Sequence, residues 1–129
     1  MKRSIFLIIT AVLGLLAGVM CLLFPEKMAA GFGMTVTPVI LMLIREAGAF
    51  NLSMGYLNFA VRNDSDSKTL KVVLLFNMTY HVLILPANVY GFSQGILSGG
   101  QAGTAFGIHL LLALGFLLYA QKMKPSALG

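Results

Sequence analysis

Four titratable side chains interrupt apolar stretches of the chain, and their types and spacing could build a site: Arg45, Glu46, His81 and His109. An ionised side chain at the centre of a membrane-spanning helix costs roughly 2.5–3.5 kcal/mol on insertion scales. Arg45 and Glu46 are adjacent and point about 100° apart on a helix, so at most one can face a given centre. We therefore expect these groups to be paired, neutralised or turned toward a protein-lined interior.

Asparagines extend this polar set along the same segments. Asn77, His81 and Asn88 recur at helical spacing, so they share one face. Measured from the expected helix ends, the titratable groups fall within about one helical turn of the same depth. The sequence thus predicts a polar pocket in the outer half of a membrane bundle. Its candidate residues are Arg45, Glu46, Asn51, Asn77, His81, Asn88 and His109.

The composition and the length of the apolar runs define the class. Hydrophobic residues make up 58% of the chain and charged residues 10%, with a mean hydropathy of +0.89, whereas soluble domains carry about 25% charged residues. Four runs are each long enough to cross a hydrocarbon core of about 30 Å as a helix. We predict one all-α domain, residues 1–129, folded as an up-down bundle of four transmembrane helices. The expected spans are residues 4–24, 38–61, 69–90 and 102–121.

Basic residues predict the orientation. Seven of them flank one side of the expected spans, and only Lys27 lies on the other side; the seven are Lys2, Arg3, Arg62, Lys68, Lys71, Lys122 and Lys124. By the positive-inside rule both termini are cytoplasmic, and we expect an integral protein of the plasma (inner) membrane. The net charge of +5 is an orientation signal. It does not indicate nucleic-acid binding, because the basic residues are split among three membrane-flanking sites.

Local signals place the expected helix boundaries. Thr37 precedes Pro38 as an N-cap residue, and Asp66 or Ser67 can cap the third span. Between the first two spans we expect a short interfacial turn. Pro86 removes a backbone donor, so the third span should kink or stop early there.

Small residues predict the packing faces. They let helix backbones approach closely in lipid and mark either the contacts of the bundle or a homo-oligomer interface. The glycines of this kind are Gly14 and Gly18 (with Cys21 on the same stripe), Gly48 and Gly55, and Gly103 and Gly107; a second stripe contains Ala102, Ala105, His109, Ala113 and Ala120.

Several functions are compatible with the predicted pocket. The polar groups could be structural and hold the helices together. Alternatively, they could bind the polar head of a lipid-like or quinone-like ligand, or they could bind a partner subunit. A redox subunit that binds haem through His81 and His109, or a metal through these histidines and Glu46, is the alternative. A proton or ion path is a further one. The chain has no nucleophile-elbow or phosphate-loop motif, so we expect no catalytic residues and no resident cofactor.

The segment Arg45-Glu46-Ala47-Gly48-Ala49-Phe50-Asn51-Leu52-Ser53-Met54-Gly55, with its arginine and spaced glycines, resembles the DoxX-like small integral membrane proteins. The number of spans and the proline at the end of the first run are similar too. The resemblance implies a four-helix membrane fold, and some DoxX-type proteins are associated with quinone-linked sulfur oxidation. No cofactor motif accompanies it here, so it transfers no catalytic residue.

Overall fold

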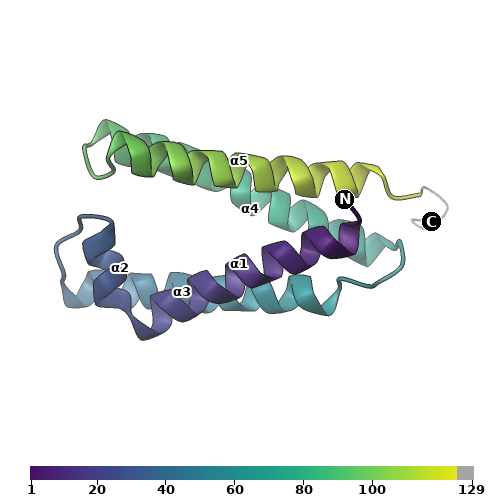
Figure 1. Ribbon diagram of the computed structural model, residues 1–129, viewed down its shortest axis with the longest axis horizontal. Coiled ribbons are helices and arrows are strands. Elements are labelled where there is room, and N and C mark those ends of the chain that lie inside the picture. Colours follow the sequence, from purple (N-terminus) through teal and green to yellow (C-terminus); the bar gives the residue numbers. More distant parts are fainter. Residues whose placement is uncertain (125–129) are drawn as a thin grey trace. The chain divides into compact units, whose positions relative to one another are not determined.

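The computed structural model describes residues 1–124 and contains only α-helices as regular secondary structure there (Figure 1). Residues 125–129 of the predicted domain lie outside the described residues. The helices are α1 (Arg3–Leu23), α2 (Pro25–Gly31), α3 (Pro38–Ala60), α4 (Lys68–Ser93) and α5 (Gly99–Gln121). The predicted all-α class is confirmed, and the four expected spans correspond to α1, α3, α4 and α5.

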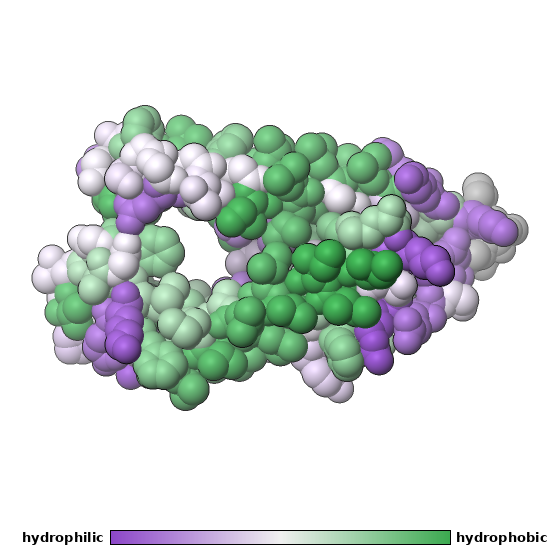
Figure 2. Space-filling model, viewed as in Figure 1, coloured by the Kyte–Doolittle hydropathy of each residue, from purple (hydrophilic) through white to green (hydrophobic). Residues whose placement is uncertain are grey.

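Three of these helices, α1, α4 and α5, are long and apolar enough to cross a membrane. Hydrophobic side chains cover the visible flanks of α1 and α5, and hydrophilic residues gather toward the helix ends (Figure 2). These features indicate a membrane protein. The 23 residues of α3 match the length of α5, but polar residues such as Arg45, Glu46 and Asn51 lower its hydropathy. The four-span topology therefore stays a prediction.

The chain divides into two compact units. Unit 1 comprises Met1–Arg62 with α1, α2 and α3, and unit 2 begins at Asn63 and contains α4 and α5. The prediction of a single domain is not tested by this division.

Glycines form the contact between α1 and α3 in unit 1, as their spacing predicted. A Cβ atom built on Gly18 would lie 2.9 Å from the carbonyl oxygen of Gly48, and one built on Gly55 would lie 2.9 Å from that of Ala11. These distances are shorter than side chains tolerate, so backbone packs directly against backbone. We call this contact the glycine seam; it consists of Gly14, Gly18, Gly48 and Gly55.

The register of the glycine seam locates Arg45 relative to α1. A Cβ on Gly48 would meet Cys21 and Leu22 near the end of α1, and α1 ends at Leu23. Arg45 precedes Gly48 by three residues, which is about 4.5 Å of helix rise. It therefore lies level with the end of α1. Because α3 begins at Pro38, its first turns project beyond α1.

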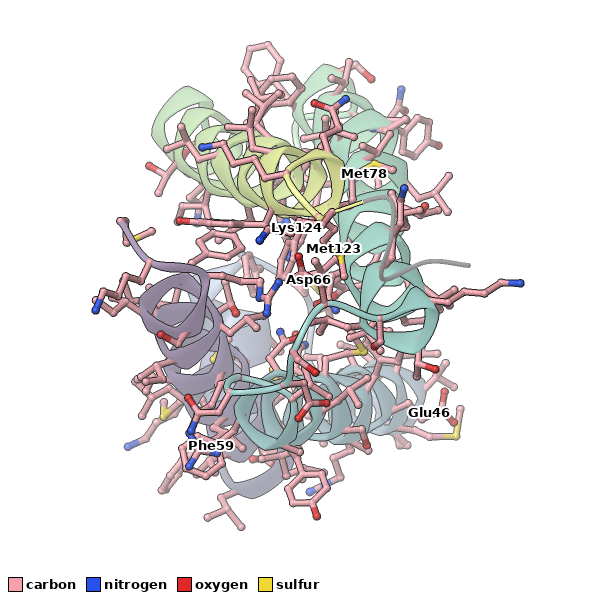
Figure 3. All side chains as sticks on the ribbon, turned by 90° about the vertical axis from the view of Figure 1, so that its right-hand side faces the viewer. Glu46, Phe59, Asp66, Met78, Met123 and Lys124 are labelled. Atoms are coloured by element: carbon pink, nitrogen blue, oxygen red, sulfur yellow. The ribbon has the colours of Figure 1, made fainter. Side chains whose placement is uncertain are left out.

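Unit 2 is an antiparallel helical hairpin with one constant register. The backbone N–H of Lys124 donates to the carboxylate of Asp66 at 3.1 Å (Figure 3), and His81 contacts His109. The chain advances by 15 residues from Asp66 to His81, and by the same number from His109 to Lys124. At the other end Gly95 turns the chain with a φ of 69°, a conformation that glycine adopts without steric cost.

The helix caps explain the observed boundaries. Thr37 accepts a hydrogen bond from the backbone N–H of Ile40 at 3.2 Å, as predicted. Of the two candidates for α4, Ser67 is the cap, while Asp66 binds Lys124 instead. Ser98 and Gln101 form a reciprocal capping box that starts α5 earlier than expected.

Three local expectations were wrong or incomplete. The connection between α1 and α3 contains the helix α2, which begins with Pro25 at its first position. The early stop at Pro86 is wrong, because α4 continues to Ser93; an interrupted helix would release further backbone groups that lipid does not satisfy. A Cβ on Gly103 or Gly107 would meet nothing within 4 Å among the described residues. These two glycines are not packing contacts of unit 2, whereas Ala102, Ala113 and Ala120 of the second stripe are buried.

The glycine seam predicts the sign of an alanine substitution. Gly55→Ala gains helix propensity of about 1 kcal/mol, but its methyl group would lie 2.8 Å from the backbone nitrogen of Leu15. We expect the clash to dominate and the protein to be destabilised by about 1–3 kcal/mol, measured by denaturation in detergent. Gly107→Ala is the matched control and should be neutral or stabilising. Equal effects of the two substitutions would contradict the seam.

Candidate functional site

His81 and His109 form the polar contact at the centre of unit 2. Their Nδ1 atoms are 2.9 Å apart, and their ring centroids are 5.1 Å apart at an interplanar angle of 41°. The distance is that of a hydrogen bond in which one ring donates its Nδ1–H and the other accepts at Nδ1. The sequence placed both residues in the candidate site, and the structure brings them together.

Aromatic side chains hold the two imidazoles in place. The His81 ring stacks on Phe116 at 5.8 Å and 17°, and Phe116 is fully buried. Tyr80 lies against both histidines, 5.1 Å from the His81 centroid and 6.5 Å from that of His109. Phe116 follows His109 by seven residues on the same face of α5, so this periodicity could have identified it in the sequence.

The geometry of the pair bears on the haem and metal alternatives. Two axial nitrogens that each bind iron at about 2.0 Å lie roughly 4 Å apart on opposite sides of the metal, farther than the 2.9 Å between these Nδ1 atoms. No group of three or more His, Cys, Asp or Glu side chains suited to a metal occurs within residues 1–124. Haem or metal binding remains a prediction that would require the rings to separate.

Asn77 and Asn88 continue the face of α4 that carries His81, and their surroundings differ. Asn77 is 2% exposed, and its Nδ2 donates to the carbonyl oxygen of Val73 at 2.9 Å. The Nδ2 atom of Asn88 is buried and has no hydrogen-bond partner among the described residues. An unsatisfied buried donor costs about 1–3 kcal/mol, and in this respect Asn88 differs from Asn51 and Asn77, whose Nδ2 atoms donate within their own helices.

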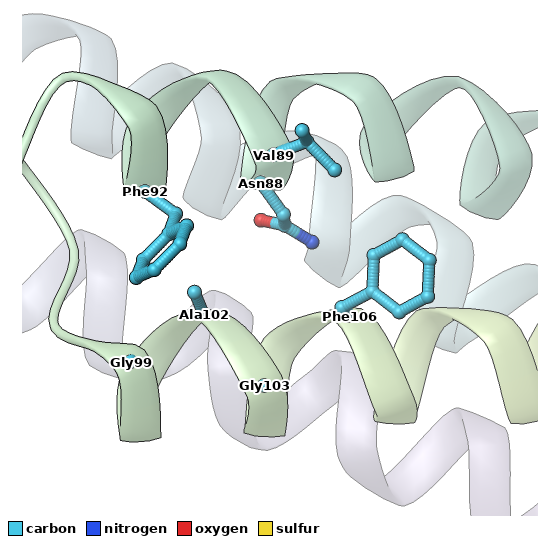
Figure 4. Close-up of a pocket in the computed structure, with 7 residues that line it drawn as sticks. All are labelled: Asn88, Val89, Phe92, Gly99, Ala102, Gly103 and Phe106. Carbon is cyan, nitrogen blue, oxygen red and sulfur yellow. The ribbon is translucent and has the colours of Figure 1, made fainter.

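Asn88 points into a pocket between the end of α4 and the start of α5 (Figure 4). The pocket has a volume of about 310 Å³, and its remaining lining residues are all apolar. They are Val89, Phe92, Gly99, Ala102, Gly103 and Phe106. This α4–α5 pocket was not predicted from the sequence, because the small residues Ala102 and Gly103 were interpreted as packing positions.

Arg45 forms an ion pair that was not predicted from the sequence. Its Nη2 atom is 3.8 Å from Oε1 of Glu26 in α2, and the two side chains are 49% and 56% exposed. Such an exposed ion pair contributes little to stability, typically below about 1 kcal/mol. Glu26 lies in the first turn of α2, next to Lys27. The ion pair could have been predicted only if α2 had been recognised as a helix.

Glu46 and Asn51 occupy other parts of α3. Glu46 is exposed and lies on the flank of α3 away from α1 (Figure 3), because it precedes the buried Gly48 by two residues, or about 200° of rotation. The Nδ2 of Asn51 donates to the carbonyl oxygen of Ala47 at 2.9 Å. One N–H group of this asparagine is therefore satisfied within its own helix.

The predicted site residues thus fall into two groups, one in each unit. Unit 2 contains the contacting pair His81 and His109, with Asn77 and Asn88 on the same helix face. Unit 1 contains Arg45, Glu46 and Asn51, which do not converge on one point of that unit. The single pocket that would join both groups stays a prediction.

Comparison of the chain with family models, with curated proteins and with solved structures gave no match. The resemblance to DoxX-like proteins is thus neither supported nor contradicted by these comparisons.

The histidine pair predicts a non-additive mutant cycle. His81→Phe alone or His109→Phe alone leaves an imidazole nitrogen buried without its partner, which should cost about 1–3 kcal/mol. The double variant removes both polar groups and should be less destabilised than the sum of the single variants. The free energy of unfolding in detergent measures the cycle. Strictly additive effects would show that the two rings do not interact.

Proposed function

We propose that this chain is a small, non-enzymatic integral protein of the plasma (inner) membrane that binds a lipid-like or quinone-like molecule in the α4–α5 pocket. The observation that carries the proposal is the unpartnered Nδ2 of Asn88 within otherwise apolar walls. Small-molecule sites combine a mostly apolar lining with a few placed polar groups. An amphipathic molecule with an acceptor oxygen matches this lining.

The size of the pocket supports a ligand larger than a single ring. A cavity of about 150 Å³ accommodates benzene, and the α4–α5 pocket has about twice that volume, 310 Å³. Gly103 leaves the wall open, because a Cβ there would meet nothing within 4 Å among the described residues. The space therefore suits a polar head with the beginning of an apolar tail.

The histidine pair has a structural role in this proposal. His81 precedes Asn88 by seven residues, so the pair lies about 10 Å from the pocket along α4. Its hydrogen bond joins the middle of α4 to the middle of α5. This leaves the outer part of the hairpin, with its small residues, free to surround a ligand.

The proposed topology has four spans, with both termini cytoplasmic. Two observations in unit 1 support α3 as the fourth span. Arg45 lies level with the end of α1 beside Glu26, where a charge is less costly than at the centre of the bilayer. Asn51 donates a hydrogen bond within its own helix. Membership of the DoxX-like group is part of the same proposal, because it implies this topology.

Ligand binding is tested by filling the pocket. In Gly103→Leu the new side chain would occupy the space that Asn88 faces, so labelling by a photoreactive phosphatidylcholine in liposomes should fall by about tenfold or more. Short-chain quinone is tested in parallel as a competitor of labelling. Gly107→Leu is the matched control, since its Cβ also meets nothing but Gly107 does not line the pocket. Equal labelling of the two variants would refute the site.

The topology is tested by cysteine accessibility. In a Cys21→Ala background, Gln94→Cys places a thiol in the turn between α4 and α5, and Ser65→Cys places one before α4. We expect an impermeant maleimide to label the first only from the outer side of intact cells and the second only after the cells are opened. The opposite pattern would invert the orientation, and labelling of both from outside would exclude α4 as a span.

A further inference from the structure

We infer that the occupant of the α4–α5 pocket is the acyl ester of a membrane glycerolipid, with the Nδ2 of Asn88 donating to the ester carbonyl oxygen. The inference rests on the proposed function and names its ligand class. Three features of the hairpin support it: the single polar residue of the lining, the depth of Asn88 and the distribution of the lining residues along the helices.

The pocket offers one side-chain donor. Asn88 is the polar residue of the lining, and all other lining side chains are apolar or absent. An ester presents a single strong acceptor, its carbonyl oxygen, followed directly by apolar methylene groups. A quinone head presents two carbonyl oxygens on opposite sides of its ring, and the lining provides no side-chain donor for the second. The Nδ2 of Asn88 carries two N–H groups, and both lie at the one polar point of the lining, which suits a single carbonyl oxygen followed by methylene groups.

The position of Asn88 along α4 matches the depth of ester groups. The histidine pair lies near the middle of both helices of the hairpin, and Asn88 lies about 10 Å from it toward the outer end. Half the thickness of a hydrocarbon core is about 15 Å. With the hairpin centred in the bilayer, Asn88 lies within about one helical turn of the boundary where ester carbonyls of lipids are found.

The residues that line the pocket are distributed along both helices. Phe92 lies about one turn outward from Asn88 on α4, and Phe106 lies about one turn inward from Ala102 on α5. Gly99 and Gly103, four residues apart, line the same wall of α5 (Figure 4). A wall without side chains between two aromatic ends suits a chain that runs parallel to the helices, as an acyl chain does.

The experiment removes the acceptor from the ligand instead of the donor from the protein. The full-length protein is reconstituted in liposomes with a photoreactive phosphatidylcholine, and diester and diether phosphatidylcholines of equal chain length are compared as competitors. We expect the diester to compete roughly three- to tenfold better than the diether, the effect of one hydrogen bond. Asn88→Leu should abolish this preference, and Asn77→Leu, on the same helix face, should retain it.

The outcomes separate the inference from the proposed function. Equal competition by diester and diether in the wild-type protein overturns the ester inference, and this comparison does not depend on any variant folding. Stronger competition by a short-chain quinone than by the diester also overturns it, while the pocket remains the binding site. If Gly103→Leu is labelled as strongly as Gly107→Leu, the proposed function and the inference both fail.

Discussion

Polar groups in a membrane helix need hydrogen-bond partners within the protein, because hydrocarbon supplies none. The chain meets this constraint mostly by local means. Asn51 and Asn77 each donate a hydrogen bond to the carbonyl oxygen of the preceding turn. His81 and His109 satisfy each other across the hairpin. Asn88 differs from these residues, because its Nδ2 has no hydrogen-bond partner among the described residues and Asn88 lines the apolar pocket.

The two units achieve helix packing by different physical means. In unit 1 the glycine seam brings two backbones into direct contact, which excludes space for any ligand along it. In unit 2 the helices meet through alanines and an aromatic cluster that includes Tyr80 and Phe116. Toward the outer end of this hairpin, Gly99 and Gly103 line the α4–α5 pocket.

The register of unit 1 changes the expected energetic cost of the charges on Arg45 and Glu46. Because α3 begins beyond the end of α1, Arg45 lies level with the end of α1 although it is about two turns into α3. The ion pair with Glu26 depends on α2, a helix of seven residues. Short helices of this kind form only with tertiary support. Neither the level of Arg45 beside the end of α1 nor its ion pair with Glu26 can be deduced by counting residues from Pro38.

The helical class, the four long helices, the cap at Thr37 and the close-packing character of Gly14, Gly18, Gly48 and Gly55 were predictable from the sequence, because they depend on composition, local hydrogen bonds and helical period. The sequence also predicted that His81 and His109 lie on inward faces. Which helices the glycines join, and which polar groups meet, depends on the tertiary structure. Register between helices determines that His81 reaches His109, that Arg45 reaches Glu26 and that Asn88 faces empty space beside Gly103. Register results from the packing of all side chains together, so no single segment encodes it.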